Sequence, residues 1–189
     1  MYKRQASIRV GQGFDKVPQA ITGFDVDSQA ALLIEYQSDD KEELREKENK
    51  GSSLLRELDL QSPAEFSADI PTRTAAWNFR KGLYAQVAEA RPSGTAALLE
   101  DVVVPVGDLA DTCSSLQELF IRYSYDDAVI FGHAKDGNIH FLLTDRFEGD
   151  SAIGRYNNFN EEMVDLVLSA EGNLKAEHGT GRALSLIHI

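Results

Sequence analysis

The sequence contains a single cysteine, Cys113, among its 189 residues. A lone cysteine forms no internal disulfide and provides no thiolate cage for zinc or an iron-sulfur cluster within the chain. Cys113 falls on the apolar stripe of a predicted helix, and we interpret it as a core residue rather than a nucleophile, because free cysteines are commonly buried. A metal ion bound by this chain would therefore need histidine and carboxylate ligands.

Long apolar runs are also absent. The longest, from Ala30 to Ile34, is far shorter than the roughly 20 residues of a membrane-spanning helix. The first residues, MYKRQ, do not lead into an apolar segment with a small-residue cleavage site, as a secretion signal would. We therefore expect no membrane span and a cytoplasmic location.

Basic residues are few relative to acidic ones. The chain has 19 Lys and Arg against 31 Asp and Glu, which gives a formal net charge of -12. A nucleic-acid-binding surface needs basic side chains that neutralise phosphates, so nucleic acid is not an expected partner. Hydrophobic residues make up 42% of the chain, which is enough for a globular core.

Hydrophobic periodicity predicts helices alternating with short strands. We expect strands at residues 30–36, 95–105, 127–134 and 139–145, and helices at about residues 40–58, 74–90, 108–123 and 160–170. This order favours an α+β fold, a ferredoxin-like antiparallel sheet with helices packed on one face. We divide the chain into a leading segment that is loop or partly non-native (residues 1–27), one domain (residues 28–182) and a non-native tail (residues 183–189).

The first predicted helix carries a leucine stripe. We expect Leu44, Leu54, Leu55 and Leu58 to face a core. Its many charged side chains would then form the solvated face of the helix.

The segment GHAKDGNIH places two histidines around an Asp-Gly pair. Asp136-Gly137 between strand-like runs predicts a two-residue hairpin turn of type I′. In that register His133 faces His140, with Cβ atoms roughly 4.5 to 5.5 Å apart on one face of the sheet. Two imidazoles at this distance could bind one ion. Without a third protein ligand, however, they could equally be residues that only support the hairpin.

A third ligand is available in the segment EHGTG, which follows the last predicted helix. Glu177 offers a carboxylate and His178 a further imidazole, and the glycines would let the backbone approach a ligand closely. Two histidines, a glutamate and a further histidine suit a divalent ion that has an open coordination position and a base beside it.

Four segments, in this order, resemble the C-terminal domain of FAD-linked oxidases, the family of D-lactate, glycolate and D-2-hydroxyglutarate dehydrogenases. WNFR resembles the W-x-x-R helix of the family and EDVVVP its E-D-x-x-x-P strand. GHAKDGNIH resembles the H-x-G-D-G-N-x-H segment, and AEHGTGR resembles G-E-H-G-x-G. Together these segments span about residues 30–182.

The resemblance implies a substrate- and metal-binding domain of a flavin-dependent 2-hydroxyacid dehydrogenase, which passes a hydride from a D-2-hydroxy acid to FAD. It implies that His133, His140 and Glu177 bind a divalent metal, most often zinc in this family. It implies that His178 is the catalytic base that takes the hydroxyl proton.

The resemblance also implies two substrate contacts. Arg80 would hold the substrate carboxylate by a bidentate contact, and Asn138 would be a second substrate-binding residue. The residues themselves leave open that Arg80 is a solvent-facing helix residue and that Asn138 only shapes the turn. The sequence departs from the family pattern at Lys135, where glycine is usual, and at Leu142, where some members have a polar substrate contact.

The resemblance implies partners outside this chain. FAD would be bound mostly by a preceding FAD-binding domain of the same parent chain, so we expect a gene fragment that is inactive by itself. The arginine of GTGR is similar to relatives in which an iron-sulfur domain follows, so such a domain or another electron acceptor is a further expected partner. Two alternatives remain: a non-catalytic ferredoxin-like module that binds a metal or small molecule, and a structural subunit.

Overall fold

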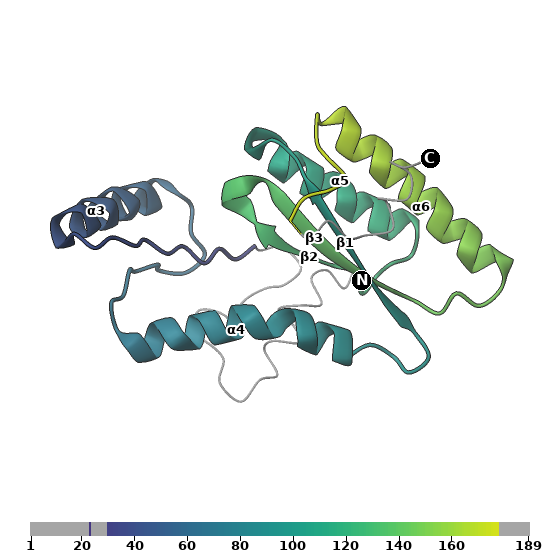
Figure 1. The fold of residues 1–189 in the computed structure, drawn as a ribbon, viewed down its shortest axis with the longest axis horizontal. Helices are drawn as coiled ribbons and strands as arrows, with labels where there is room; N and C mark the ends of the chain where they lie inside the picture. The colour runs from purple at the N-terminus through teal and green to yellow at the C-terminus, as the bar shows by residue number, and fades with distance from the viewer. Residues whose placement is uncertain (1–22, 24–29, 178–189) are drawn as a thin grey trace.

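The structure is a computed structural model that describes residue 23 and residues 30–177. At its centre lies a three-stranded antiparallel sheet with the order β1-β3-β2 (Figure 1). The strands are β1 (Ala96–Val103), β2 (Val129–His133) and β3 (Asn138–Asp145). Helix α5 (Leu109–Arg122) connects β1 to β2 after the 3₁₀ turn η1 (Val106–Asp108), and helix α6 (Asp150–Ser169) follows β3. The predicted α+β fold is therefore confirmed.

A short bridge continues the sheet beyond β1. Asn173 pairs antiparallel with Val103, and the two residues exchange backbone hydrogen bonds of 2.8 and 3.0 Å. With this bridge as a rudimentary fourth strand, the connectivity is β-α-β-β-α-β, which is the ferredoxin-like arrangement.

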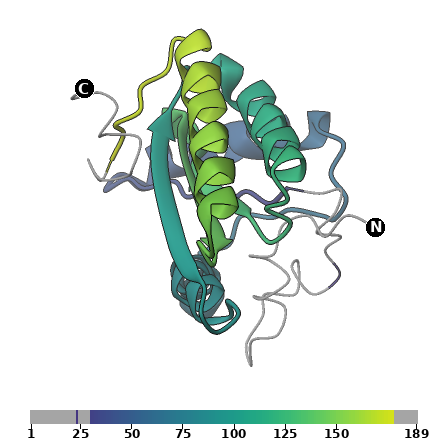
Figure 2. The ribbon, with the colours of Figure 1, turned by 90° about the vertical axis from the view of Figure 1, so that its right-hand side faces the viewer.

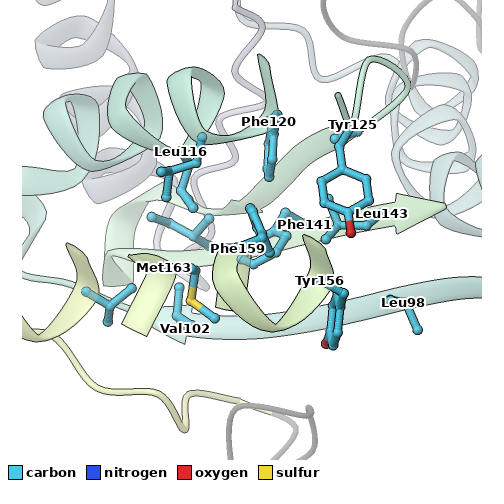
Figure 3. Close-up of a cluster of buried hydrophobic side chains, with 14 of the residues drawn as sticks. Leu98, Val102, Leu116, Phe120, Tyr125, Phe141, Leu143, Tyr156, Phe159 and Met163 are labelled. Atoms are coloured by element: carbon cyan, nitrogen blue, oxygen red, sulfur yellow. The ribbon is translucent and has the colours of Figure 1, made fainter. Parts of the chain in front are cut away.

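Helices α5 and α6 run side by side along one face of the sheet (Figure 2). The side chains of Phe141, Phe120 and Phe159 meet between the layers, with ring centroids 5.6 to 6.1 Å apart, and Met163 lies beside them (Figure 3). Cys113 packs against this core as predicted, and burial raises the pKa of its thiol.

Helix α4 (Ile70–Glu89) adds a layer on the opposite face. Its Val87 packs against Val129 and Leu142, whose side chains point away from the α5 and α6 face because successive strand residues alternate. Leu142 is therefore part of the packing under α4, with 1% of its surface exposed.

Helix α3 (Lys41–Glu57) stands apart from the sheet (Figure 1). The side chain of Asp40 caps its first turn, with a 2.8 Å hydrogen bond from the Glu42 N–H. Leu44 and Leu55 are half-buried, but Leu54 and Leu58 are 52% and 59% exposed. The prediction that these two face a core is wrong, because little of the described part of the chain covers that side of the helix.

Residues 30–36 were expected to form a strand and do not, since they follow an extended path without pairing to another strand of the described part. Two helices also begin earlier than predicted. Pro71 lies in the first turn of α4, where proline is tolerated, and the Asp69 carboxylate accepts a 2.9 Å hydrogen bond from the Thr72 N–H. Helix α6 begins at Asp150 rather than near Asn160. Its first turns contain Gly154 and two adjacent asparagines, which have low helix propensity, but Tyr156 and Phe159 already belong to its buried stripe.

The leading segment of residues 1–27, apart from residue 23, and the tail of residues 183–189 lie outside the described residues. Within the described part, no helix combines the length and the apolar character needed to cross a membrane.

Candidate metal site

The hairpin between β2 and β3 has a longer loop than the sequence predicted. Residues Ala134–Asp136 form a 3₁₀ turn, and Gly137 follows in the left-handed conformation with φ 69°. His133 consequently pairs with Asn138 rather than with His140, and His140 pairs with Phe131. The predicted two-residue turn and its register are wrong. A shift of two residues preserves the face to which each side chain points, so both imidazoles still lie on one side of the sheet.

The two histidines are diagonal neighbours on this face. Their ring centroids are 5.5 Å apart and the rings are almost perpendicular, with an interplanar angle of 88°. Diagonal cross-strand side chains of this length are within reach of each other. The structure therefore brings His133 and His140 together by a different register from the one expected.

Glu177 completes a group of three potential ligands. Its Oε2 lies 3.2 Å from Nε2 of His133 and 3.4 Å from Nε2 of His140, and one ligand atom of each residue lies within 4.8 Å of the others. Ligand atoms bound tetrahedrally to zinc at about 2.1 Å are about 3.4 Å from one another. The two distances to Glu177 match that spacing, so these three side chains are the residues of the described part that could hold a divalent ion.

The position of Glu177 depends on the bridge beyond β1. Asn173, Val103, Asn138 and His133 form one row across the sheet, because each is the backbone partner of the next. The bridge at Asn173 thus holds the segment that follows α6 in the same row as His133. Glu177 follows a few residues later. Sequence reasoning identified the glutamate but could not derive this row.

Burial differs among the three side chains. His140 is 4% exposed, whereas His133 and Glu177 are 47% and 52% exposed. One side of the group is therefore closed by the sheet and the other is open. Three protein ligands with an open side leave a coordination position for a water molecule or substrate, as in catalytic zinc sites.

Asp101 is a site residue that sequence reasoning did not single out. It is the cross-strand partner of His140, its side chain is 1% exposed, and its Oδ1 lies 3.0 Å from Nδ1 of His140. Asn138 donates a 2.8 Å hydrogen bond from Nδ2 to the same oxygen. The available signal was the acidic pair Glu100-Asp101 within a mostly apolar strand, since acidic residues are rarely buried without a partner.

Arg80 approaches the site from α4. It is half-buried, and its guanidinium carbon lies 5.8 Å from the ring centroid of Phe131. The same ring lies 5.4 Å from His140. Lys135 is exposed on the hairpin loop, and His178, the predicted base, lies outside the described residues, so the substrate and base roles stay predictions.

The chain belongs to the family described as FAD linked oxidases, C-terminal domain, which matches residues 4–185. Three curated relatives show the range of similarity. The chain is 29% identical to the glycolate oxidase subunit GlcD of Bacillus subtilis, over 49% of this chain and 21% of that protein. It is 29% identical to the mitochondrial D-lactate dehydrogenase [cytochrome] of Kluyveromyces lactis, over 62% of this chain and 20% of that protein. It is 25% identical to the mitochondrial D-2-hydroxyglutarate dehydrogenase of Arabidopsis thaliana, over 79% of this chain and 25% of that protein.

The chain thus spans only a fifth to a quarter of the length of these relatives. Their names describe much longer proteins, in which the matched region is one part.

Proposed function

We propose that the chain is the substrate- and metal-binding domain of a flavin-dependent 2-hydroxyacid dehydrogenase. The observation that carries the proposal is the group of His133, His140 and Glu177, whose Nε2 and Oε2 atoms approach one another on the face of the sheet opposite α5 and α6. Membership of the FAD-linked oxidase family supports it, as do three relatives whose names contain glycolate, D-lactate and D-2-hydroxyglutarate.

In this proposal the three ligands hold one divalent cation, which we take to be zinc because the donor set is two imidazoles and one carboxylate. The cation, when bound, acts as a Lewis acid toward the carboxylate and hydroxyl oxygens of the substrate. His133 and Glu177, on the exposed side, leave room for those oxygens, and the buried His140 anchors the site to the sheet.

The other residues would bind and deprotonate the substrate. Arg80 would form paired hydrogen bonds with the substrate carboxylate, and His178, next to Glu177 in the chain, would take the hydroxyl proton. The FAD-binding domain of the parent chain would hold the flavin that accepts the hydride. An iron-sulfur domain or other electron acceptor, the substrate contact of Asn138 and the cytoplasmic location stay predictions.

The test has a binding step and an activity step. The purified chain titrated with Zn²⁺ should bind one equivalent, and Glu177→Ala should bind it much more weakly, whereas the control Glu171→Ala, at an exposed carboxylate on the same segment, should bind as the wild type does. Joined to the FAD-binding domain of its parent chain, the metal-loaded protein should reduce its flavin with a D-2-hydroxy acid, and His178→Ala should stop that reduction. Failure of a panel of D-2-hydroxy acids to reduce the flavin would contradict the dehydrogenase proposal.

The alternative of a non-catalytic metal-binding module keeps one specific support, since all three potential ligands lie within this short chain. Stoichiometric zinc binding without flavin reduction in the joined protein would favour that alternative.

A further inference from the structure

Asp101 is one of very few acidic side chains that the sheet buries. Its side chain is 1% exposed, and it lies on the face that carries His140, Phe131 and Asn138, away from the aromatic core under α5 and α6. A buried carboxyl group is costly unless polar partners compensate for the water it has lost. The partners of Asp101 therefore indicate why the strand retains it.

Two neighbours on β3 contact a single oxygen of Asp101. Asn138 donates a hydrogen bond of 2.8 Å from Nδ2 to Oδ1, and Nδ1 of His140 lies 3.0 Å from the same Oδ1. The first contact holds the carboxyl group in place, and the second brings it to the far side of the imidazole ring from Nε2. Nε2 is the atom that faces Glu177.

The two nitrogens of His140 thus face different partners. A neutral imidazole has one N–H donor and one lone-pair acceptor. If Nδ1 carries the hydrogen and faces Asp101, the lone pair is on Nε2 and faces the space shared with Glu177 and His133. Histidines that bind metals commonly use this arrangement, in which a carboxylate on the other ring nitrogen fixes the tautomer and the orientation of the ring.

We propose that Asp101 is a positioning residue of the metal site, held by Asn138, and that it acts through His140 by fixing the Nδ1–H tautomer. This inference depends on the proposed function, because it assigns a role toward the proposed cation. It assigns Asn138 a defined task, namely to orient Asp101. The Oδ1 of Asn138, buried and without a hydrogen-bond partner in the described part of the chain, does not take part in that task.

The test measures Zn²⁺ affinity in the full chain by competition with a chromophoric chelator. Asp101→Ala should weaken binding about 10- to 100-fold, the usual effect of losing such an outer partner. Asp101→Asn, which keeps an oxygen acceptor, should fall between that variant and the wild type. The matched control is Asp145→Asn, a buried aspartate of the same sheet whose partners are Tyr125 and Arg155, and it should bind zinc as tightly as the wild type.

A double-mutant cycle separates positioning from general support of the fold. In the His133→Ala background, Asp101→Ala should still weaken binding, because His140 remains to be oriented. In the His140→Ala background it should have less than about a twofold further effect, because residues that act through one another are not additive. Equal losses in both backgrounds would overturn the proposal.

The tautomer of His140 gives a measurement that needs no variant. In ¹⁵N-labelled wild-type chain loaded with Zn²⁺, the ring shifts should show Nδ1 protonated and Nε2 bound to the metal, and the reverse assignment would overturn the proposal. Zinc binding by the wild type with unchanged affinity in Asp101→Ala would overturn this inference alone. A wild type that binds no zinc would overturn the proposed metal site and this inference with it.

Discussion

Arg80 reaches the candidate site across the ring of Phe131. The guanidinium carbon lies 5.8 Å from the ring centroid, on a residue that also contacts His140 at 5.4 Å between ring centroids. The guanidinium group is planar and packs favourably against an aromatic ring. Such a plane can bind a carboxylate through two parallel hydrogen bonds, which an ammonium group cannot reproduce.

Replacing Arg80 tests whether its guanidinium binds the substrate carboxylate. In the protein joined to its FAD-binding domain, Arg80→Lys should lower kcat/KM for the 2-hydroxy acid about 10- to 100-fold, since a hydrogen bond to a charged group contributes about 1.5 to 3 kcal/mol. Steady-state kinetics would measure the change. The matched control is Arg73→Lys on the same helix, where the arginine pairs with Glu35. Equal kcat/KM values for the two variants would contradict a role for Arg80 in substrate binding.

A second group of polar side chains lies at the other end of β3. Tyr125 and Arg155 donate hydrogen bonds of 3.0 and 2.7 Å to Oδ2 of Asp145. Burial, together with the hydrogen bond to Asp145, raises the pKa of Tyr125 to about 12. Burial would also raise the pKa of Asp145, but hydrogen bonds from Arg155, the Phe147 N–H and Tyr125 outweigh that effect and lower the pKa.

The raised pKa of Tyr125 predicts a loss of stability in alkali. The folded protein favours the neutral phenol, so this contribution is complete below the unfolded tyrosine pKa of about 10 and disappears as the pH rises through about 12. Tyr125→Phe should be less stable at neutral pH by about 1 to 3 kcal/mol. Its free energy of unfolding should also fall less steeply than that of the wild type over this alkaline range. Urea unfolding at several pH values would measure both, and parallel pH profiles would contradict the assignment.

At the scale of elements, the β2–β3 hairpin depends on one residue in the left-handed conformation. Gly137 has φ 69°, and a Cβ atom there would lie 1.9 Å from the Val104 carbonyl oxygen. In the protein as it is, the Val104 N–H donates a 3.0 Å hydrogen bond to the Gly137 carbonyl. The loop is therefore packed against the chain that follows β1.

Gly137→Ala should destabilise the protein by at least about 2 kcal/mol, because a non-glycine residue costs about 1 to 2 kcal/mol in this conformation and the clash adds to it. Zinc affinity should fall as well, since His133 and Asn138 flank the loop. The control is Gly107→Ala, where a Cβ atom meets nothing within 4 Å. Urea unfolding and zinc titration of both variants would measure the difference, and similar results for the two would contradict the role of the loop.

The sequence predicted most elements but not how they pair. Apolar spacing located α5 through Leu116 and Phe120, and the strand-like run after the Asp-Gly pair located β3, which is buried on both faces. It could not distinguish a two-residue turn at Asp136-Gly137 from the observed 3₁₀ turn with one left-handed glycine, because both use the same residue types. The strand expected at residues 30–36 failed for a related reason, since an apolar run becomes a strand only where another strand is available to pair with it.

At the scale of the whole molecule, the sequence likewise predicted the residues of the candidate site but not all of the contacts among them. The motif spacing identified His133, His140 and Glu177, and the structure places them within reach of one another. Asp101 lies in the EDVVVP motif, which was interpreted from the sequence only as a strand. Its contact with His140 follows from the pairing of β1 with β3, which no local pattern encodes.

The chain also divides into a sheet core and a smaller lobe around α3 (Figure 1). In the lobe, the rings of Tyr36 and Phe66 lie 5.2 Å apart and close over Gly51, where a Cβ atom would lie 2.8 and 2.9 Å from them. The lobe is tied to α4 through Glu35, which accepts hydrogen bonds from Arg73 and Trp77. This small aromatic contact is separate from the core around Phe141 and Phe159.

Because the two packing centres are separate, Gly51→Leu should open the lobe without unfolding the sheet. Limited proteolysis should then cut within residues 30–69 faster than in the wild type, while zinc affinity and the main urea transition remain unchanged. The opposite pattern is expected for Met163→Ala, which should lower the stability of the whole sheet core by about 2 to 5 kcal/mol. If Gly51→Leu weakened zinc binding or shifted the main transition as much as Met163→Ala does, lobe and sheet would form one cooperative unit and the metal site would depend on both.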